Sequence, residues 1–314
     1  MAAMTRRRKG EKVDGWLVVD KPRGLTSTAV VTRVRRLFNA AKAGHAGTLD
    51  PIATGVLPVA LGEATKTVAF AMEGRKTYRF TVRWGEGRTT DDAEGELVAS
   101  SAVRPTQSEI HAALPRFLGE VAQVPPPYSA VKIEGQRAYA LARAGEVPEL
   151  GARIVWIDRI DLLGMPDRDH ADFEVTCGKG AYMRGLVRDL AAALGTCGHI
   201  VHLRRLAVGR FSERHAIPLD KLEALGHSAA ALEHLQPVET ALADIPALAL
   251  TDIEAKLLRS GRPVQVLRTA DRVRIDGMAE GEVVCAMAGG KPVALTRLSR
   301  GPILQLHPVR VLNV

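Results

Sequence analysis

Asp50 lies in a stretch of sequence that is well suited to present a single carboxylate. It is the one acid in GHAGTLDPIATGVLPVALG, residues 44–62, and Pro51 follows it directly. Because proline disfavours the helical region for the residue before it, we expect Asp50 in an extended or turn conformation. The surrounding glycines would let the backbone pass close to a ligand, and the apolar run 56–61 would anchor the loop to a core. By pattern alone an ordinary Asp-Pro turn is the commoner explanation, and a carboxylate that does chemistry is the alternative.

Three other side chains could act beside such a carboxylate, although each also has an ordinary explanation. His45 precedes Asp50 in the same loop and could be a plain hydrogen-bonding residue. Tyr78 falls on the apolar face of residues 76–84, whose strict alternation predicts a strand, and by pattern it is a core tyrosine. Arg184 begins an amphipathic helix that Gly195 ends, where an exposed arginine is common.

Helices and strands of ordinary length are predicted around these residues. Residues 16–20 and 199–206 read as strands, and Thr106-Gln107-Ser108-Glu109 has the spacing of a capping box that starts a helix through Leu114. Residues 64–72 and 213–243 have helical patterns. From Ile245-Pro246 onward, short alternating segments between Gly- and Pro-marked turns indicate a small β unit.

Composition limits the class of protein. The chain has 314 residues with 46% hydrophobic content, which suits one large domain or two unequal ones. Its formal charge of +8 favours a polyanionic partner. Three scattered cysteines exclude a disulfide framework and a Cys-x-x-Cys metal site, and they fit a reducing cytoplasm. We find no membrane-span run, no P-loop and no dinucleotide fingerprint, and the basic segment 1–14 reads as a flexible arm.

The loop and three further segments together resemble one known family. GHAGTLDPIATGVLPVALGEATK is similar to the catalytic loop of the TruB family, the tRNA pseudouridine-55 synthases. DKPRGLTST, KGAYMRGLVRDL and HLRRLAVGRF match further motifs in the family's order, over roughly residues 15–211. Residues 128–143, with a helix to Arg143, resemble the stand-alone bacterial enzymes more than the guide-RNA-dependent relatives.

The resemblance implies an α+β fold and a division of the chain. Residues 15–245 would form the pseudouridine synthase core, a mixed and largely antiparallel sheet flanked by helices. Residues 246–314 would form a small β-rich PUA-like RNA-binding domain. The enzyme would be cytoplasmic and would isomerise uridine at position 55 in the T-loop of tRNA. Its partner would be the T stem-loop of tRNA. It would need no cofactor, no metal, no membrane, no guide RNA and no obligate protein partner.

The resemblance also assigns roles to single residues. Asp50 would be the nucleophile, Tyr78 would lie against the target base and take part in proton transfer, and Arg184 would hold the carboxylate charged and oriented. The helical pattern, by contrast, predicts that Arg188, one turn further on, is an exposed surface residue. The residues that would bind the substrate, besides Tyr78, are His45, Asp92, Tyr182 and Leu203. Those that would support the site are Lys21, Gly47 and Thr48.

Two other classes of function fit parts of the pattern. A carboxylate-dependent glycosidase or nucleoside hydrolase would also use Asp50, but would ordinarily need a second, paired carboxylate and would release free uracil. An RNA chaperone or binding module would need neither Asp50 nor Arg184. Asp50→Asn separates the second class, because RNA refolding would survive it.

Overall fold

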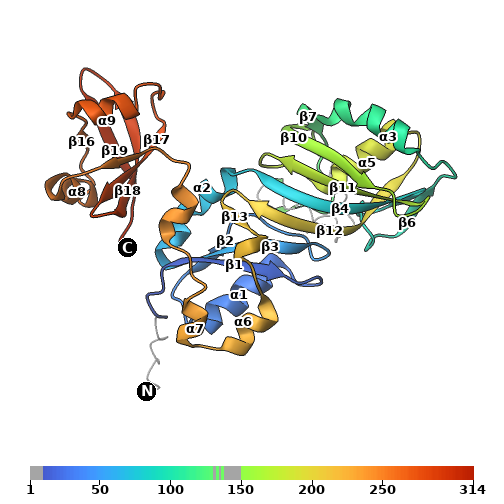
Figure 1. The fold of residues 1–314 in the computed structure, drawn as a ribbon, viewed down its shortest axis with the longest axis horizontal. Coiled ribbons are helices and arrows are strands. Elements are labelled where there is room, and N and C mark those ends of the chain that lie inside the picture. Colours follow the sequence, from blue (N-terminus) through green and yellow to red (C-terminus); the bar gives the residue numbers. More distant parts are fainter. Residues whose placement is uncertain (1–9, 130–131, 134–135, 138–149) are drawn as a thin grey trace.

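The computed structural model describes residues 10–129, 132–133, 136–137 and 150–314. A ten-stranded sheet and its helices form the larger part of the molecule, and a separate five-stranded sheet forms the smaller part near the C-terminus (Figure 1). The larger sheet is mixed: β1 pairs with β14, and β3 with β12, in parallel, whereas its other pairings are antiparallel. The α+β fold class expected from the sequence is therefore confirmed.

The strands of the larger sheet follow an order that brings distant segments side by side. Along the sheet the order is β14 (Ile217–Pro218), β1 (Gly15–Lys21), β3 (Thr54–Leu61), β12 (Gly198–Val208), β4 (Lys76–Trp84), β11 (His170–Cys177), β10 (Arg153–Gly164) and β7 (Gly119–Gln123). Two short strands lie off this path, β2 (Ala43–His45) on β3 and β13 (Phe211–Ser212) on β12. Strand β12 thus lies between the strand that follows the Asp50 loop and the strand that carries Tyr78.

Helices pack on the larger sheet at both of its ends. Near β1 lie α1 (Ser27–Leu37), α6 (Leu219–Leu225) and α7 (Ala229–Leu232), and at the opposite end lie α3 (Gln107–Ala113) and α5 (Met183–Ala193) (Figure 1). Alternation in β4 buries Phe80, Val82 and Trp84, and the Phe80 ring stacks on that of Phe173 with centroids 5.5 Å apart. The predicted capping box of α3 is present, with Thr106 and Glu109 bonded to each other's backbone.

Two helical predictions are wrong in detail. Residues 62–67 form a 3-10 turn, η1 (Gly62–Thr67), and only α2 (Val68–Glu73) after it is α-helical. The segment 213–243 is interrupted: η3 (Glu213–His215), β14, α6, α7 and η4 (Val238–Leu242) replace one long helical region. Pro218 and Gly226 bound α6, because proline removes a backbone donor and Gly226 adopts a positive φ of 60°.

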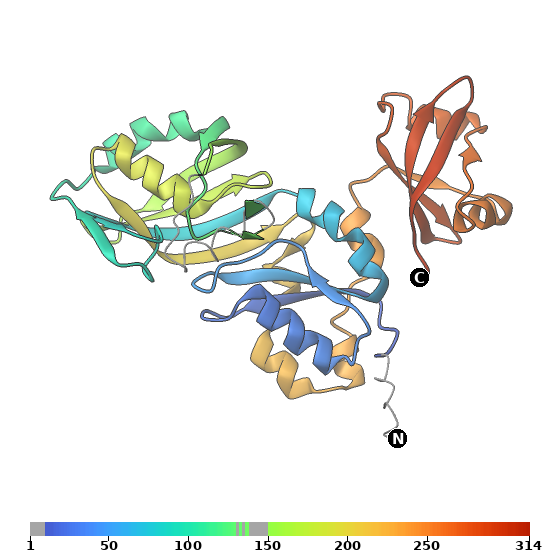
Figure 2. The same cartoon turned by 180° about the vertical axis from the view of Figure 1, so that it is seen from behind.

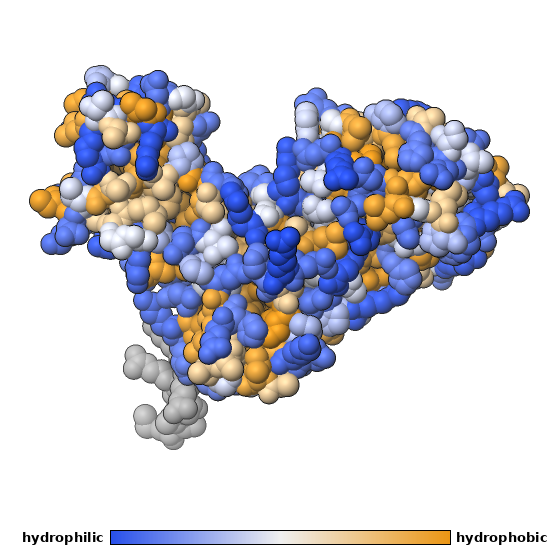
Figure 3. Space-filling view, viewed as in Figure 1, coloured by the Kyte–Doolittle hydropathy of each residue, from blue (hydrophilic) through white to orange (hydrophobic). Residues whose placement is uncertain are grey.

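The C-terminal unit has its own sheet and core. Its strands lie in the order β15 (Ala247–Ala249), β17 (Val283–Ala288), β18 (Lys291–Arg300), β19 (Leu304–Val311) and β16 (Val264–Gln265), with α8 (Asp252–Arg259) and α9 (Thr269–Arg274) beside them. Seen from behind, it stands apart from most of the larger sheet and is joined near α2 (Figure 2). Figure 3 shows an open, mostly hydrophilic notch between this unit and the end of the larger sheet that carries α3 and α5.

A small junction ties the C-terminal unit to the larger part. The Lys66 ammonium donates to the Val311 carbonyl at 2.8 Å, and the Asn313 amide donates to Glu63 at 2.8 Å. Phe70 packs against an apolar cluster that includes Leu242. The β-rich unit therefore touches the segment that directly follows β3.

Parts of two sequence predictions fall outside the described residues. The helix expected up to Arg143 lies there, and of that region the structure describes the pair β8 (Lys132–Ile133) and β9 (Gln136–Arg137). Residues 1–9 of the predicted arm also lie outside. Further along the arm, the Glu11 amide donates to the Asn39 carbonyl at 2.6 Å. No helix in the described part of the chain is long and apolar enough to cross a membrane.

Candidate active site

Asp50 lies in the loop between β2 and β3, and the backbone of that loop depends on two glycines. Gly47 and Gly55 have positive φ values of 94° and 98°, in the region that favours glycine. A Cβ added at Gly55 would lie only 2.2 Å from the carbonyl oxygen of Arg205, so this position also requires the absence of a side chain. The Ala53 amide donates to the Asp50 carbonyl at 3.1 Å and closes the turn. The Asp50 side chain itself remains 32% exposed, so a substrate can reach it.

Arg184 holds the Asp50 carboxylate from inside the protein. Its Nε donates to Asp50 Oδ2 at 2.9 Å, and its Nη2 lies 2.8 Å from the same oxygen. The remaining donors bond backbone carbonyls of Thr90 at 2.8 Å and Tyr128 at 2.7 Å. The side chain is only 3% exposed, so the first turn of α5 directs Arg184 inward rather than to solvent. Four contacts fix the plane of the guanidinium and thereby the carboxylate it grips.

Asp92 is the second carboxylate beside Arg184. Its Oδ2 lies 3.6 Å from Arg184 Nε, a longer pair than that with Asp50. Its other oxygen accepts from the Thr90 hydroxyl at 2.5 Å and from the Glu94 amide at 3.0 Å. Asp92 is 6% exposed, so its oxygens are taken by protein groups and it orients Arg184 rather than facing a substrate.

The neighbouring pair of Asp91 and Arg188 corrects a prediction. Arg188, expected as a plain surface residue, has 32% of its side chain exposed and lies 3.1 Å from the carboxylate of Asp91. It also donates to the Val124 carbonyl at 2.7 Å. Burial raises the pKa of Asp91 to about 6, although Arg188 and then Arg184 oppose that shift by their charge. The helix turn brings Arg188 back over the same acidic loop that holds Arg184, which the helical pattern alone did not reveal.

Four residues expected around the target base lie on strands or at a helix start near the Asp50 loop. Tyr78 lies on β4 directly opposite Arg205 of β12, and Leu203 lies opposite Phe80 on the same pair of strands. Tyr182 precedes α5, and the Gln123 amide group accepts from its backbone N–H at 2.8 Å and donates to its carbonyl at 3.1 Å. Burial raises the pKa of both tyrosines, and the negative charge of Asp50 raises each further. His45 is half-buried at the end of β2, opposite Val59, where the chain enters the loop.

Lys21 and Ser27 support the loop from the side of β1 and α1. The buried Lys21 ammonium donates to the carbonyls of Leu25 at 2.7 Å, Pro22 at 2.9 Å and Pro51 at 3.3 Å. Desolvation lowers the pKa of Lys21 to about 8. Ser27 both donates to the Leu49 carbonyl at 3.1 Å and accepts from its amide at 2.8 Å. The residues on either side of Asp50 are therefore fixed by side chains from a different part of the chain.

Arg205 is a residue of this site to which the sequence assigned no role. It is 1% exposed, and it donates to the carbonyls of Val56 at 2.8 Å, Gly47 at 3.0 Å and Thr48 at 3.5 Å. The available signal was its place two residues after Leu203 on a predicted strand, which puts both on one side. Thr48, expected only as a supporting residue, contributes a carbonyl to this contact.

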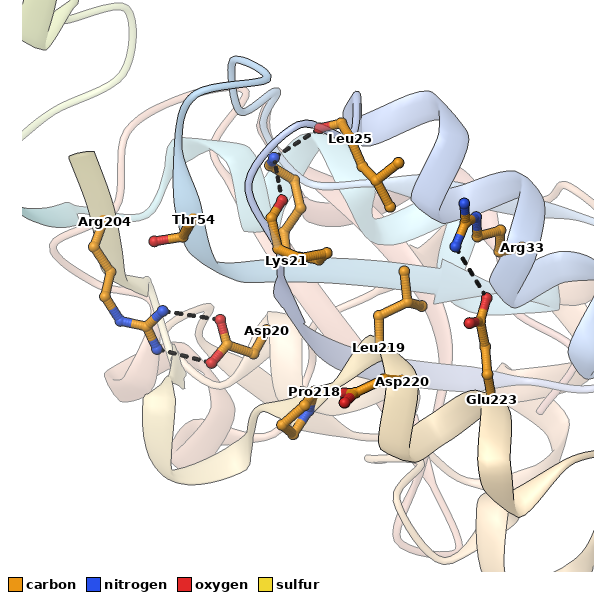
Figure 4. Close-up of a pocket in the computed structure, with 11 residues that line it drawn as sticks. Asp20, Lys21, Leu25, Arg33, Thr54, Arg204, Pro218, Leu219, Asp220 and Glu223 are labelled. Atoms are coloured by element: carbon orange, nitrogen blue, oxygen red, sulfur yellow. Dashed lines mark hydrogen bonds and ion pairs between the residues drawn. The ribbon is translucent and has the colours of Figure 1, made fainter. Parts of the chain in front are cut away.

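A cavity of about 340 Å³ adjoins the loop on its outer side (Figure 4). Lys21 and Thr54 form part of its wall, and two ion pairs border it: Arg204 with Asp20 at 2.9 Å, and Arg33 with Glu223 at 3.4 Å. None of the four residues expected around the base lines this cavity. It therefore lies beside the Asp50 loop rather than at the Asp50 carboxylate.

The described residues contain no group of three or more His, Cys, Asp or Glu side chains placed to hold a metal ion. The charged groups of the site are instead engaged with one another and with backbone carbonyls. What this arrangement offers chemically is one partly exposed carboxylate, held by a buried arginine and close enough to two tyrosines for its charge to act on them. Such a group can act as a nucleophile or as a base.

Comparison with known proteins identifies relatives over the full length of the chain. Residues 35–183 match the family model "TruB family pseudouridylate synthase (N terminal domain)", and residues 184–243 match "tRNA pseudouridylate synthase B C-terminal domain". Proteins called tRNA pseudouridine synthase B from Rhodospirillum rubrum and Caulobacter vibrioides are each 53% identical to it, over 99% of this chain and 100% of theirs.

Solved structures agree on the fold. A chain of a Cbf5-Nop10-Gar1 complex is 26% identical and superimposes with a TM-score of 0.72, covering 95% of this chain and 84% of that one. A chain of an H/ACA RNP bound to a substrate RNA containing 2′-deoxyuridine, 23% identical, shares the fold with a TM-score of 0.73. The family-model matches and the 53% identity to the two bacterial relatives show that the chain belongs to the TruB family of pseudouridylate synthases.

Proposed function

We propose that the protein isomerises uridine to pseudouridine at position 55, in the T-loop of tRNA. The observation that carries the proposal is the Asp50 carboxylate, partly exposed and gripped by the buried Arg184 at 2.8 Å, in a chain of this family. The relatives that are 53% identical are named as tRNA pseudouridine synthases, which supports tRNA as the substrate. The formal charge of +8 suits a polyanionic partner.

The reaction needs only one bond broken and one formed at the same sugar carbon. The N1–C1′ bond breaks and uracil leaves with the electron pair. The base then turns, C5 bonds to C1′, and the hydrogen on C5 is lost as a proton while N1 gains one. Asp50 starts the sequence either by bonding to C1′ or by taking the proton on C2′ to give a glycal. No electron is gained or lost overall, so the proposal includes no redox cofactor.

The target base must leave the folded T-loop to reach Asp50. Extrusion of a base costs a few kcal/mol, and stacking on an aromatic ring returns about 1–3 kcal/mol per base. We assign this stacking to Tyr78, with Tyr182 and Leu203 completing the uracil pocket. His45 would occupy space that the extruded base leaves in the loop. Tyr78 would also take part in the transfer of the C5 proton.

Lys21, Gly47, Thr48 and Asp92 act indirectly in this proposal. Lys21 and the backbone of the two loop residues keep the carboxylate in place, and Asp92 keeps Arg184 in place. A hydrolase would need a second carboxylate free to act as an acid. Asp92 does not suit that role, because its oxygens accept from Thr90 and Glu94 while facing Arg184.

The remaining parts of the chain would bind tRNA. Residues 246–314 would act as a PUA-like RNA-binding domain, and residues 1–14 as a basic arm that touches phosphate. Eight arginines of the C-terminal unit are exposed, which supports an electrostatic contact: Arg259, Arg262, Arg268, Arg272, Arg274, Arg297, Arg300 and Arg310. We place the enzyme in the cytoplasm, acting without guide RNA, protein partner or metal.

Incubation with an unmodified tRNA transcript, followed by mapping of pseudouridine, tests the proposal. Pseudouridine should form at position 55, and a transcript with cytidine there should gain none. Release of free uracil without pseudouridine would identify a hydrolase instead. Activity should persist in EDTA once tRNA folding is controlled for, and loss restored only by zinc would contradict the metal-free mechanism.

A further inference from the structure

We propose that Arg205 is a positioning residue for this reaction, one that holds both ends of the Asp50 loop in a single geometry beside Tyr78. The inference rests on the proposed function for the reaction it serves, but the geometry stands by itself. Arg205 touches neither the Asp50 carboxylate nor Arg184 through any hydrogen bond or ion pair found among the described residues. It acts on the loop backbone instead.

The three carbonyls that Arg205 bonds lie on both sides of Asp50. Gly47 and Thr48 precede the carboxylate by three and two residues, and Val56 follows it by six. The guanidinium therefore bridges the entrance and the exit of the loop. With Lys21 on the Pro51 carbonyl and Ser27 on Leu49, the backbone is held from one side by β12 and from the other by β1 and α1.

The loop and the arginine fit each other closely. A Cβ added at Gly47 would lie 3.2 Å from Arg205 Nη1, and Gly55 packs against the backbone of Arg205 itself. Arg205 also pairs with Gly55 in the parallel register between β3 and β12. Both glycines therefore let the loop approach the arginine, so a change at either end of this contact disturbs the other.

Tyr78 is coupled to the same guanidinium. It lies directly across from Arg205 in the antiparallel register between β4 and β12. The positive charge of Arg205 opposes the rise in the pKa of Tyr78 that burial causes. Arg205 thus bonds the loop that presents the carboxylate and lies next to the tyrosine that would face the base.

Stability alone does not explain a fully buried arginine at this position. Among the ion pairs between described residues Arg205 has no carboxylate partner, and removing an unpaired charge from water is costly. An apolar side chain of similar size would fill the space at less cost if filling it were the only need. A planar group with several fixed donors is, however, what three separate carbonyls require.

The test compares Arg205→Gln and Arg205→Lys with Arg204→Lys, the adjacent residue on the same strand. The Arg204 side chain, 36% exposed, pairs with Asp20 and Glu213, and among the described residues it forms no hydrogen bond with residues 44–56. Leu222→Ala, in the buried face of α6, serves as a control for lost stability. Each variant is assayed below the onset of its own unfolding by single-turnover rate at saturating tRNA, tRNA affinity, and hydrogen exchange of residues 44–62.

We expect Arg205→Gln to slow turnover about a hundredfold with tRNA affinity within about threefold, because misplacing a catalytic group by about 1 Å has an effect of this order. Arg205→Lys should recover about a tenth of the wild-type rate, since an ammonium keeps the charge but not the planar donors. Arg204→Lys and Leu222→Ala should turn over at nearly the wild-type rate. In Arg205→Gln, any ionisation of Tyr78 that limits the rate should shift to higher pH.

A rate for Arg205→Gln equal to that of Leu222→Ala would overturn the positioning role. If wild-type protein makes no pseudouridine at all, the proposed function fails, and hydrogen exchange still decides the structural part. Faster exchange of residues 44–62 in Arg205→Gln than in Arg204→Lys supports the bridge across the loop. Equal exchange in the two variants would show that Arg205 does not hold the loop.

Discussion

The region around Asp50 and the C-terminal unit use charged residues in opposite ways. Around Asp50 the charged side chains of Lys21, Asp92, Arg184 and Arg205 are buried, and most of their partners are backbone carbonyls. In residues 247–314 the arginines are exposed, and the only buried polar side chain is that of Thr296. Only around Asp50 does the protein bear the free-energy cost of removing charged side chains from water.

The buried charges fix the positions of groups in the site, whereas the exposed charges attract a polyanion. A buried charge is held in place by several donors and acceptors, so its position is fixed, and a change of one atom in it should affect rate. An exposed charge acts over a Debye length, about 8–10 Å, and is screened by salt, so its exact position matters little. Substitutions in the two regions should therefore change different measured quantities.

The largest expected effect is that of Asp50→Asn. An amide of nearly the same size keeps the contact to Arg184 but removes the negative charge, so pseudouridine formation should fall by a factor of about a thousand or more. The affinity for tRNA should stay within about tenfold, because binding is spread over many phosphate and base contacts. Quantitative pseudouridine mapping with a filter-binding titration checks both, and near wild-type turnover in the purified variant would refute the role of Asp50.

Arg184→Lys should have the next largest effect. Lysine keeps the charge but cannot reach Asp50 and the Thr90 and Tyr128 carbonyls from one planar group, so turnover should fall about a hundredfold with little change in affinity. Arg159→Lys, on an exposed arginine of β10, is the matched control. Equal single-turnover rates for the two variants would mean that the grip on Asp50 does not matter for the reaction.

Arg188→Lys should lower the rate less than Arg184→Lys does, but more than the control Arg159→Lys. Its pair with the buried Asp91 and its bond to the Val124 carbonyl are partly lost, so we expect a rate about three- to tenfold below wild type. The same single-turnover assay measures it. A silent Arg188→Lys would restore the view of Arg188 as a surface residue and would confine the sensitive region to Arg184.

Removal of residues from Ala247 onward should affect binding more than turnover. The exposed arginines go with it, so tRNA affinity should fall about tenfold or more and depend less steeply on salt. Phe70→Ser in the truncated chain limits aggregation, because Phe70 loses the apolar partners that residues 247–314 contribute, such as Leu295 and Leu312. A folded truncation with no activity at saturating tRNA would contradict the assignment of chemistry to the larger part.

The smallest expected effect concerns stability and pH. Asp91 has a pKa of about 6 in the folded protein against 3.8 for its ordinary value, so the folded state binds its proton more tightly than the unfolded state. Its contribution to stability is therefore present below pH 3.8 and is lost as the pH rises through 6. Between pH 5 and 7.5 this loss is about 1 kcal/mol.

Asp91→Asn removes that titration. The free energy of unfolding of the variant should consequently fall less between pH 5 and 7.5 than that of wild type, by about 1 kcal/mol. Urea denaturation at the two pH values measures the difference. Identical pH dependence in the two proteins would show that Asp91 does not titrate in this range.

The sequence by itself determined the family, the fold class and the residues that could do chemistry. The alternation of β4, the capping box of α3 and the inward face of α5 follow from local patterns, because a side chain's direction repeats every two residues in a strand and every 3.6 in a helix. Pro218 and Gly226 are common helix breakers, but the prediction of a helical region over residues 213–243 followed the Leu- and Ala-rich pattern around them and missed both interruptions.

Only the tertiary structure decided which charges are buried and what they bind. Arg184 and Arg188 lie one turn apart on the same helix and read alike in sequence, yet one is 3% exposed and the other 32%. Arg204 and Arg205 are neighbours, and one binds Asp20 at the surface while the other binds the Asp50 loop in the core. Each of these four arginines has at least one partner more than 90 residues away in the sequence, and no local pattern contains such a partner. Burial of a charge depends on the carbonyls and carboxylates that folding brings to it, because without those partners the charge would remain in water.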